Sequence, residues 1–241
     1  MITNKHLANK TQFGIFHYLT ITYAIIYLIS NIAAVKVVEY GPWSLKSYDF
    51  GPYPLDAGTW YFPLLYIIND ILTEIYGFKN TRKTIWISMF STAISMLLFY
   101  LVVGLDGIDT QETKGFNAVF TFSPLILFAS VTSFVVGEYF NSVILSKLKL
   151  KFAGKYFILR ATFSTAIASA VESSIFATIA FSHIYDFTSL ANMVMLLVLI
   201  KVGYELLSSP VTLYIIKLIK KNEQCDHYDY DTKFSFLPFA K

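Results

Sequence analysis

The sequence predicts an all-α integral membrane protein with six transmembrane helices. Its composition is 55% hydrophobic and only 15% charged, whereas soluble domains carry about 25% charged residues. Mean hydropathy is +0.54. Apolar stretches recur along the chain, each long enough for a spanning helix of about 20 residues. Between these stretches, loops rich in Lys and Arg alternate with loops that contain few of them, as expected of a multi-pass protein.

Six apolar stretches define the expected helices. They cover residues 18–38, 60–76, 85–105, 125–145, 156–181 and 190–219. The last two exceed the minimum span, which is compatible with tilting. We therefore expect one transmembrane transporter domain over residues 1–221 and a polar cytoplasmic tail over residues 222–241.

The distribution of charge predicts the orientation. Most of the 19 Lys and Arg residues lie in the N-terminal arm, the second and fourth loops and the C-terminal tail. The positive-inside rule then places both termini in the cytoplasm. The first outer loop, residues 39–59, is rich in Gly, Pro and aromatic residues, which predicts a short hairpin or a lid, with a plain connector as the alternative.

Ionisable side chains interrupt the apolar stretches. Such a group costs roughly 2.5–3.5 kcal/mol at a helix centre, so it persists where it lines a polar cavity, forms a pair or moves a substrate. The groups at membrane depth are Asp70, Glu74, Glu138, Glu172, Glu205 and Lys201. They predict a polar interior that binds a ligand.

Two spacings suggest how these groups interact. Asp70 and Glu74 are four residues apart and share a helix face. Glu74 is near the basic second loop, so an interfacial ion-pair cluster is the alternative to function there. Lys201 and Glu205 are also four apart and can form an intrahelical pair, functional or purely structural. Pro210 removes a backbone hydrogen bond and can kink the helix.

Several features argue against catalysis. The sequence has no Walker A loop, HExxH, GxSxG or dinucleotide fingerprint, so we expect no intrinsic ATPase, no enzyme, no metal, no cofactor and no nucleic-acid partner. Cys225 is the single cysteine, which excludes an internal disulfide. The tail around it is expected to be solvated.

The second stretch and its exit carry a family resemblance. The residues that carry it are Phe62, Pro63, Tyr66, Asp70, Thr73, Glu74, Tyr76, Gly77, Lys79, Arg82 and Trp86. This pattern resembles the queuosine precursor transporter family, also called the vitamin uptake transporter or YhhQ-like family. Further similarities lie at Asn31 and Lys36, at Arg160 and Glu172, and at Lys201, Glu205, Pro210 and Tyr214. Two positions depart from the family: Asn141 replaces a frequent Asp, and Glu138 a common Gln.

The resemblance implies import of a 7-deazaguanine (preQ0, preQ1 or queuine) across a bacterial inner membrane, for queuosine synthesis in tRNA. Carboxylates accept hydrogen bonds from a guanine-like edge, and aromatic rings stack on a flat heterocycle. We expect the binding residues to be Asn31, Trp60, Phe62, Tyr66, Asn69, Asp70, Glu138, Asn141, Glu172, Lys201 and Glu205. Lys36, Glu74 and Pro210 are expected in coupling or gating.

Other interpretations are compatible with the residues. One is a substrate-binding subunit of an ATP-driven vitamin importer. A second is a membrane enzyme that uses intramembrane carboxylates on a lipid or prenyl substrate. A purely structural bundle is the weakest, because five acids face one deep lysine. Proton coupling and facilitated diffusion both fit, and so does assembly into a homo-oligomer in the lipid bilayer.

Overall fold

The computed structural model describes residues 14–40, 43–45, 48–50, 53–121 and 124–238. Along the chain, the elements are α1 (Ile15–Ala33), β1 (Val37–Tyr40), β2 (Trp43–Leu45), β3 (Tyr48–Phe50), β4 (Tyr53–Asp56), the 3-10 helix η1 (Ala57–Trp60), α2 (Phe62–Tyr76), α3 (Phe78–Val103), α4 (Gln111–Phe120), α5 (Pro124–Lys151), α6 (Phe157–Phe181) and α7 (Phe187–Glu223).

Five of these helices, α1, α3, α5, α6 and α7, are long and apolar enough to cross a membrane. This confirms the prediction of an all-α, multi-pass membrane protein. The remaining expected span, the second along the chain, corresponds to α2. This helix has only 15 residues and measures about 22 Å at 1.5 Å per residue. α2 is therefore shorter than the other five helices.

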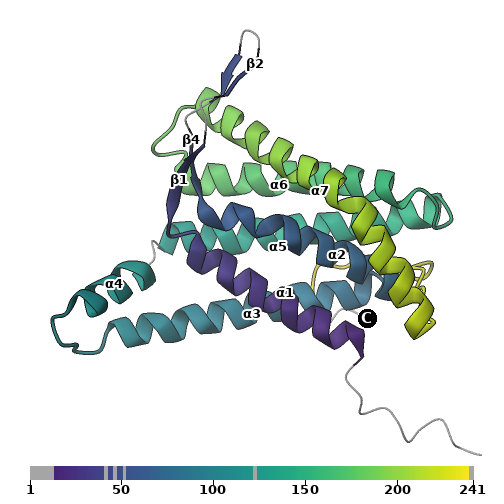
Figure 1. The fold of residues 1–241 in the computed structure, drawn as a ribbon, viewed down its shortest axis with the longest axis horizontal. Coiled ribbons are helices and arrows are strands. Elements are labelled where there is room, and N and C mark those ends of the chain that lie inside the picture. Colours follow the sequence, from purple (N-terminus) through teal and green to yellow (C-terminus); the bar gives the residue numbers. More distant parts are fainter. Residues whose placement is uncertain (1–13, 41–42, 46–47, 51–52, 122–123, 239–241) are drawn as a thin grey trace, which may run out of the picture.

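α2 lies inside the helix bundle (Figure 1), where it packs against α1, α3, α5 and α7. All residues from Ile68 to Tyr76 are buried. Their neighbours include Tyr27 on α1, whose ring stacks on Phe134 of α5 with 3.7 Å between centroids. By contrast, α3 exposes a series of large apolar side chains that are suited to lipid: Ile87, Phe90, Ile94, Leu97, Leu98 and Leu101. The core therefore surrounds α2, and α3 has a lipid-facing surface.

The first loop forms the expected hairpin. β1 pairs antiparallel with β4, with Val37 opposite Asp56, and β2 pairs antiparallel with β3. Some boundaries differ from the expected ones: α1 ends at Ala33 instead of continuing to residue 38, α3 begins at Phe78 instead of residue 85, and α5 ends at Lys151 instead of residue 145. The β-branched pair Val37-Val38 favours a strand, and the chain turns before it. Lys36 is consequently exposed at the base of the hairpin, where its carbonyl accepts a hydrogen bond from the Ala57 N–H at 2.8 Å.

The third loop contains α4, a helix that we did not predict. Its sequence has polar first turns and no apolar span. The Thr110 side chain caps it by accepting a hydrogen bond from the Thr113 N–H at 3.2 Å, with Glu112 in the first turn, an arrangement that stabilises helix starts. Phe120 stacks on Phe99 of α3 at 4.1 Å. Figure 1 shows α4 beside the same end of the bundle as the hairpin.

At the opposite end, residues 224–238 (the C-terminal segment) pack onto the helices. The expectation of a solvated tail was wrong. Asp229 is only 3% exposed, and its carboxylate accepts hydrogen bonds from the Phe78 N–H at 2.9 Å and the Ser146 hydroxyl at 2.7 Å. The segment's backbone carbonyls accept hydrogen bonds from Arg82, Trp86 and Tyr139. Hydrogen-bond acceptors of the C-terminal segment are therefore paired with donors at the ends of the helices.

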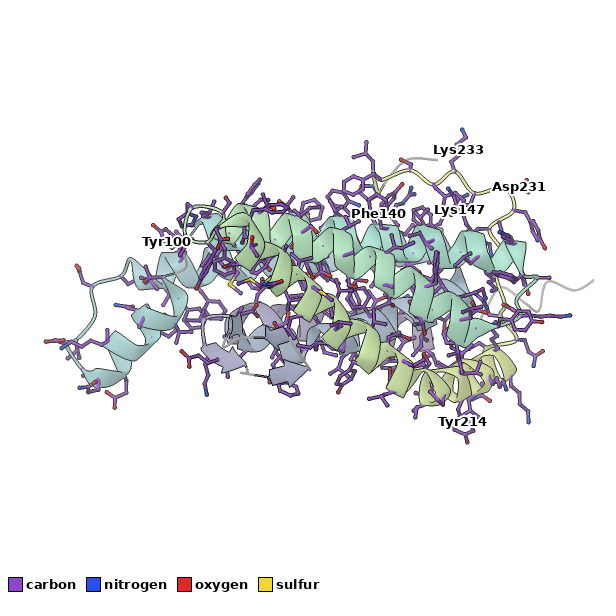
Figure 2. The ribbon with its side chains drawn as sticks, turned by 90° about the horizontal axis from the view of Figure 1, so that it is seen from above. Tyr100, Phe140, Lys147, Tyr214, Asp231 and Lys233 are labelled. Carbon is purple, nitrogen blue, oxygen red and sulfur yellow. The ribbon has the colours of Figure 1, made fainter. Side chains whose placement is uncertain are left out.

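Gly77 makes this docking possible. It separates α2 from α3 with a φ of 77°, a conformation that glycine adopts without strain. A Cβ at this position would also collide with the His227 ring. Beside it, the His227 N–H donates to the Ile75 carbonyl at 3.0 Å. Figure 2 shows Asp231 and Lys233 of the segment at the same end as Lys147, with Tyr100 of α3 at the other end.

Docking of the segment can be tested through Cys225, the single cysteine. Its thiol lies against the Ile75 carbonyl, and burial raises the pKa of the Cys225 thiol, so maleimide labelling should be slow. Asp229→Ala leaves the Phe78 N–H unpaired, at a cost of about 1–3 kcal/mol, and should accelerate labelling. Asp231→Ala, at an exposed neighbour, is the control and should not. Equal rates in wild type and Asp229→Ala would contradict the docked arrangement.

Candidate functional site

A cavity of ≈ 340 Å³ opens at the hairpin end of the bundle. This volume lies within the roughly 300–1,000 Å³ typical of small-molecule sites. The lining combines apolar walls with polar groups from α1, β4, η1, α5, α6 and α7 and from the loops that follow α4 and α6. Those polar groups are Ser30, Asn31, Asp56, Thr59, Thr121, Ser130, Ser133, Glu172, Ser173, Tyr185 and Lys201, and the aromatic walls include Phe62, Phe176 and Phe181.

A buried ion pair lies in the cavity wall. Lys201 Nζ on α7 is 2.9 Å from Glu172 Oε2 on α6, and both side chains are about 95% shielded from solvent. The Tyr66 hydroxyl on α2 donates to the same carboxylate oxygen. Lys201 also lies 5.1 Å from the centre of the Phe62 ring and 5.6 Å from that of Tyr66, within the range of cation–π contacts. Three helices therefore converge on one pair of opposite charges.

This pairing corrects one expectation. The spacing allowed Lys201 to pair with Glu205 on its own helix, but Lys201 pairs across the bundle with Glu172. Close approach of α5 to α6 helps to position Glu172. A Cβ on Gly137 would lie 2.7 Å from the Glu172 Cβ, so glycine is required at that contact.

The Asn31 amide forms the α1 side of the cavity. Its nitrogen donates to the Tyr27 carbonyl at 2.8 Å, and its oxygen accepts from the Ser130 hydroxyl at 2.9 Å. These two hydrogen bonds fix the orientation of the amide. Asn31, Phe62, Glu172 and Lys201 are thus the predicted binding residues that line the cavity.

Sequence reasoning missed Asp56, which was treated only as an outer-loop acid. It ends β4 and caps η1 by accepting a hydrogen bond from the Thr59 N–H at 3.1 Å. Burial raises the pKa of the Asp56 carboxyl, and the nearby charge of Lys201 partly offsets that rise. The signal available in the sequence was the Asp-x-x-Thr spacing of a helix cap directly before the second apolar stretch.

Deeper in the bundle is a second group, which we call the polar layer. It consists of five predicted binding residues and Ser142: Asn69, Asp70, Glu138, Asn141, Ser142 and Glu205. These residues are buried and do not line the cavity. The Asn69 amide donates to the Glu138 carboxylate, and its oxygen accepts from the Ser142 hydroxyl at 3.1 Å. The Asn141 amide donates to Asp70 at 2.7 Å. The expected single binding set is therefore divided between two depths.

At the far end of the bundle, Glu74 is the centre of a third group, the Glu74 cluster: Glu74, Lys149, Arg160, Lys220 and Asp226. Glu74 pairs with Arg160 at 2.8 Å and Lys220 at 2.9 Å. The expected partners were the second-loop residues Lys79, Arg82 and Lys83, and this was wrong, because the closer cations come from α5, α6 and α7.

Asp226 joins the C-terminal segment to this cluster through Lys149 at 2.6 Å and Lys220 at 2.8 Å. Burial disfavours ionisation of its carboxyl, but the two lysines outweigh that effect and hold the pKa of Asp226 below its ordinary value. The cluster therefore joins α2, α5, α6, α7 and the segment in one ion-pair network.

Three predicted residues lie outside these groups. Trp60 is 61% exposed at the end of η1, and Lys36 is exposed at the base of the hairpin. α7 continues through Pro210 as one helix. Tyr66, by contrast, bridges the groups: it is buried above the polar layer, and its hydroxyl reaches the Glu172 carboxylate.

Comparison with known proteins gives the same picture. The sequence profile of the family described as "Putative vitamin uptake transporter" matches residues 56–215. A relative from Bacillus subtilis (strain 168), named "Probable queuosine precursor transporter", is 25% identical over 199 residues, which cover 81% of this chain and 82% of the relative. A protein of the same name from Haemophilus influenzae is 24% identical over 132 residues, or 54% of this chain and 53% of the relative. No solved structure matches the chain.

The matched region includes α2, α6 and most of α7, and with them Glu172, Lys201 and the polar layer. The relatives are named as transporters, in agreement with the prediction that the chain is not an enzyme. By the profile match over more than half of its length, the chain belongs to the vitamin uptake transporter family, and it is a multi-pass membrane transporter.

Proposed function

We propose that this chain imports a 7-deazaguanine, such as preQ0 or preQ1, for queuosine synthesis, and that the cavity beside Glu172 and Lys201 binds it. The observation that carries the proposal is the buried Glu172–Lys201 pair in the wall of an otherwise apolar and aromatic cavity. The names of the two relatives support the class of cargo.

The chemistry of the cavity suits this cargo. A guanine edge offers N–H donors beside a carbonyl oxygen, and a carboxylate next to an ammonium group complements that pattern. The flat ring system can stack on Phe62 or Phe176, both of which line the cavity. Asp56 supplies a second acid to the lining, which would favour the aminomethyl cation of preQ1.

The arrangement of the ends supports six crossings with both termini in the cytoplasm. The Ile15 N–H at the start of α1 donates to Glu223 at the end of α7, at 2.8 Å. A chain that begins and ends its helical part at the same side crosses an even number of times. Five helices are long enough to span, so α2, extended by η1, would supply the sixth crossing. Together with the bacterial origin of the two relatives, this topology supports a location in the bacterial inner membrane.

The two ends of the bundle differ in the way transport requires. The cavity opens beside the hairpin, the predicted outer face, whereas the Glu74 cluster and the C-terminal segment close the predicted cytoplasmic face. Import then requires the ion pairs of Glu74 to separate while the outer end closes. Pro210 leaves one backbone carbonyl of α7 without its usual partner, which makes α7 a suitable element for that bending.

The function is tested by queuosine content in the tRNA of a bacterium that can neither make preQ0 nor import it. This chain should restore queuosine when a trace of preQ0 or preQ1 is supplied, and the better precursor identifies the cargo. Glu172→Gln and Lys201→Met should abolish rescue, because each removes one half of the recognition pair. Glu112→Gln, an exposed carboxylate on α4, is the control and should rescue fully.

Absence of rescue by a well-expressed, membrane-inserted chain with preQ0, preQ1 and queuine (the last with a salvage enzyme present) would contradict the assigned cargo. Purified protein in liposomes should also transport without ATP. A requirement for an added ATPase subunit would instead indicate the substrate-binding subunit of an ATP-driven importer.

A double substitution separates binding from structural support. Loss of one partner of a buried ion pair leaves a lone charge and typically costs about 3–5 kcal/mol, whereas replacing both is often neutral. We therefore expect Glu172→Gln and Lys201→Met each to lower the Tm in detergent, and the double variant to recover much of that loss without recovering uptake. Restored uptake in the double variant would show that the pair only holds α6 to α7.

A further inference from the structure

Two acids of the polar layer have an unusual environment. Asp70 on α2 and Glu205 on α7 are buried and interact electrostatically with each other. Among the described residues neither is in an ion pair, and neither is Glu138 of the same layer, whereas Glu74 and Glu172 both are. Within the described part of the chain, one oxygen of each, Asp70 Oδ2 and Glu205 Oε2, has no hydrogen-bond partner, and neither does the buried Asn141 Oδ1, whose amide nitrogen donates to Asp70.

The groups that face this pair do not neutralise it. The strongest charge interactions of Asp70 are with three acids, Glu205 on α7, Glu138 on α5 and Glu74 on its own helix. Glu205 accepts a hydrogen bond from the Ser209 hydroxyl at 3.1 Å, and the lysine one turn before it is paired with Glu172 on α6. Two carboxylates buried together without a cation strongly disfavour double ionisation.

Asp70 and Glu205 lie next to the residues that hold Glu172 in the cavity wall. Tyr66 and Asp70 are four residues apart on α2, and Lys201 and Glu205 are four apart on α7, so each acid lies one helical turn, about 6 Å, from a group that holds Glu172. A change in the separation of α2 and α7 at Glu172 is therefore transmitted to the acids. The same movement that rearranges the cavity would bring the two carboxylates together or separate them.

We propose that Asp70 and Glu205 form the site of a coupling proton and that import by this chain is driven by the proton gradient. This inference rests on the proposed transport function and adds its energy source. One proton binds from the outer side as the O–H of a carboxylic acid in the pair, where it also supplies a donor for an orphaned oxygen. After the inward transition, it leaves to cytoplasmic water, and both acids are free to bind another proton.

The protonation state can be measured without any solute. Infrared spectroscopy of the lipid-reconstituted protein should show the C=O stretching band of a buried carboxylic acid at neutral pH. The band should lose intensity in the Asp70→Asn/Glu205→Gln double variant, where the buried Glu138 still contributes, and keep its full intensity in Asp106→Asn/Glu112→Gln, which changes two exposed acids. In each single variant, it should disappear at a lower pH, because the like charge is gone. An unchanged band in the double variant would overturn the assignment.

Coupling is measured in proteoliposomes with labelled preQ0, which carries no charge. An inside-alkaline pH gradient should drive accumulation in wild type, and a protonophore should abolish it. Asp70→Asn and Glu205→Gln should lose gradient-driven accumulation to a much greater extent than exchange of internal for external preQ0, while the exposed-acid control keeps both. Accumulation driven by a sodium gradient instead of the pH gradient would overturn the proposal. So would undiminished pH-driven accumulation in Asp70→Asn and Glu205→Gln.

The two assays separate this inference from the transport assignment. If wild type exchanges no preQ0, the cargo is wrong, while the infrared band still decides whether the acids hold a proton. If wild type exchanges preQ0 but shows neither the band nor a response to the pH gradient, the cargo stands and the proton site does not.

Discussion

The free energy of placing charge away from water is the constraint on which this structure depends. Five acids and a lysine lie inside a bundle whose outer surface is suited to lipid, and each must be neutralised by a partner or a proton. Glu172 is neutralised by Lys201, and Glu74 by Arg160 and Lys220. Asp70, Glu138 and Glu205 form no ion pair among the described residues. Because the acids are neutralised in different ways, the polar interior is divided into three depths: the cavity, the polar layer and the Glu74 cluster.

The division links packing to transport. α2 is short, almost entirely buried and in contact with α1, α3, α5 and α7. It contributes Tyr66, which donates to Glu172 beside the cavity, Asp70 in the polar layer and Glu74 in the cluster at the far end. Each group lies one turn beyond the previous one. A displacement of α2 would therefore act on all three depths, which makes this helix the element through which the cavity, the proton site and the cytoplasmic closure can respond to one another.

Much of the fold followed from the sequence, because spanning length, apolar composition and the placement of lysines are local properties. The helices at residues 156–181 and 60–76 were found nearly at their observed bounds. What escaped prediction depends on contacts between distant residues. The intrahelical pairing of Lys201 with Glu205 was the expectation from spacing alone, yet Glu172 is brought closer by the approach of α6 over Gly137. The docking of Asp229 onto Phe78 likewise depends on a glycine turn far away in the chain.

Direct binding of labelled preQ0 and preQ1 to the purified protein tests the central claim, that the Glu172–Lys201 cavity recognises a 7-deazaguanine. We predict saturable binding that unlabelled guanine-type compounds displace and adenine does not, because only the guanine edge presents N–H donors beside a carbonyl to the charged pair. Binding should be lost in Glu172→Gln and kept in Glu112→Gln. Equal displacement by adenine, or undiminished binding to Glu172→Gln, would contradict the account.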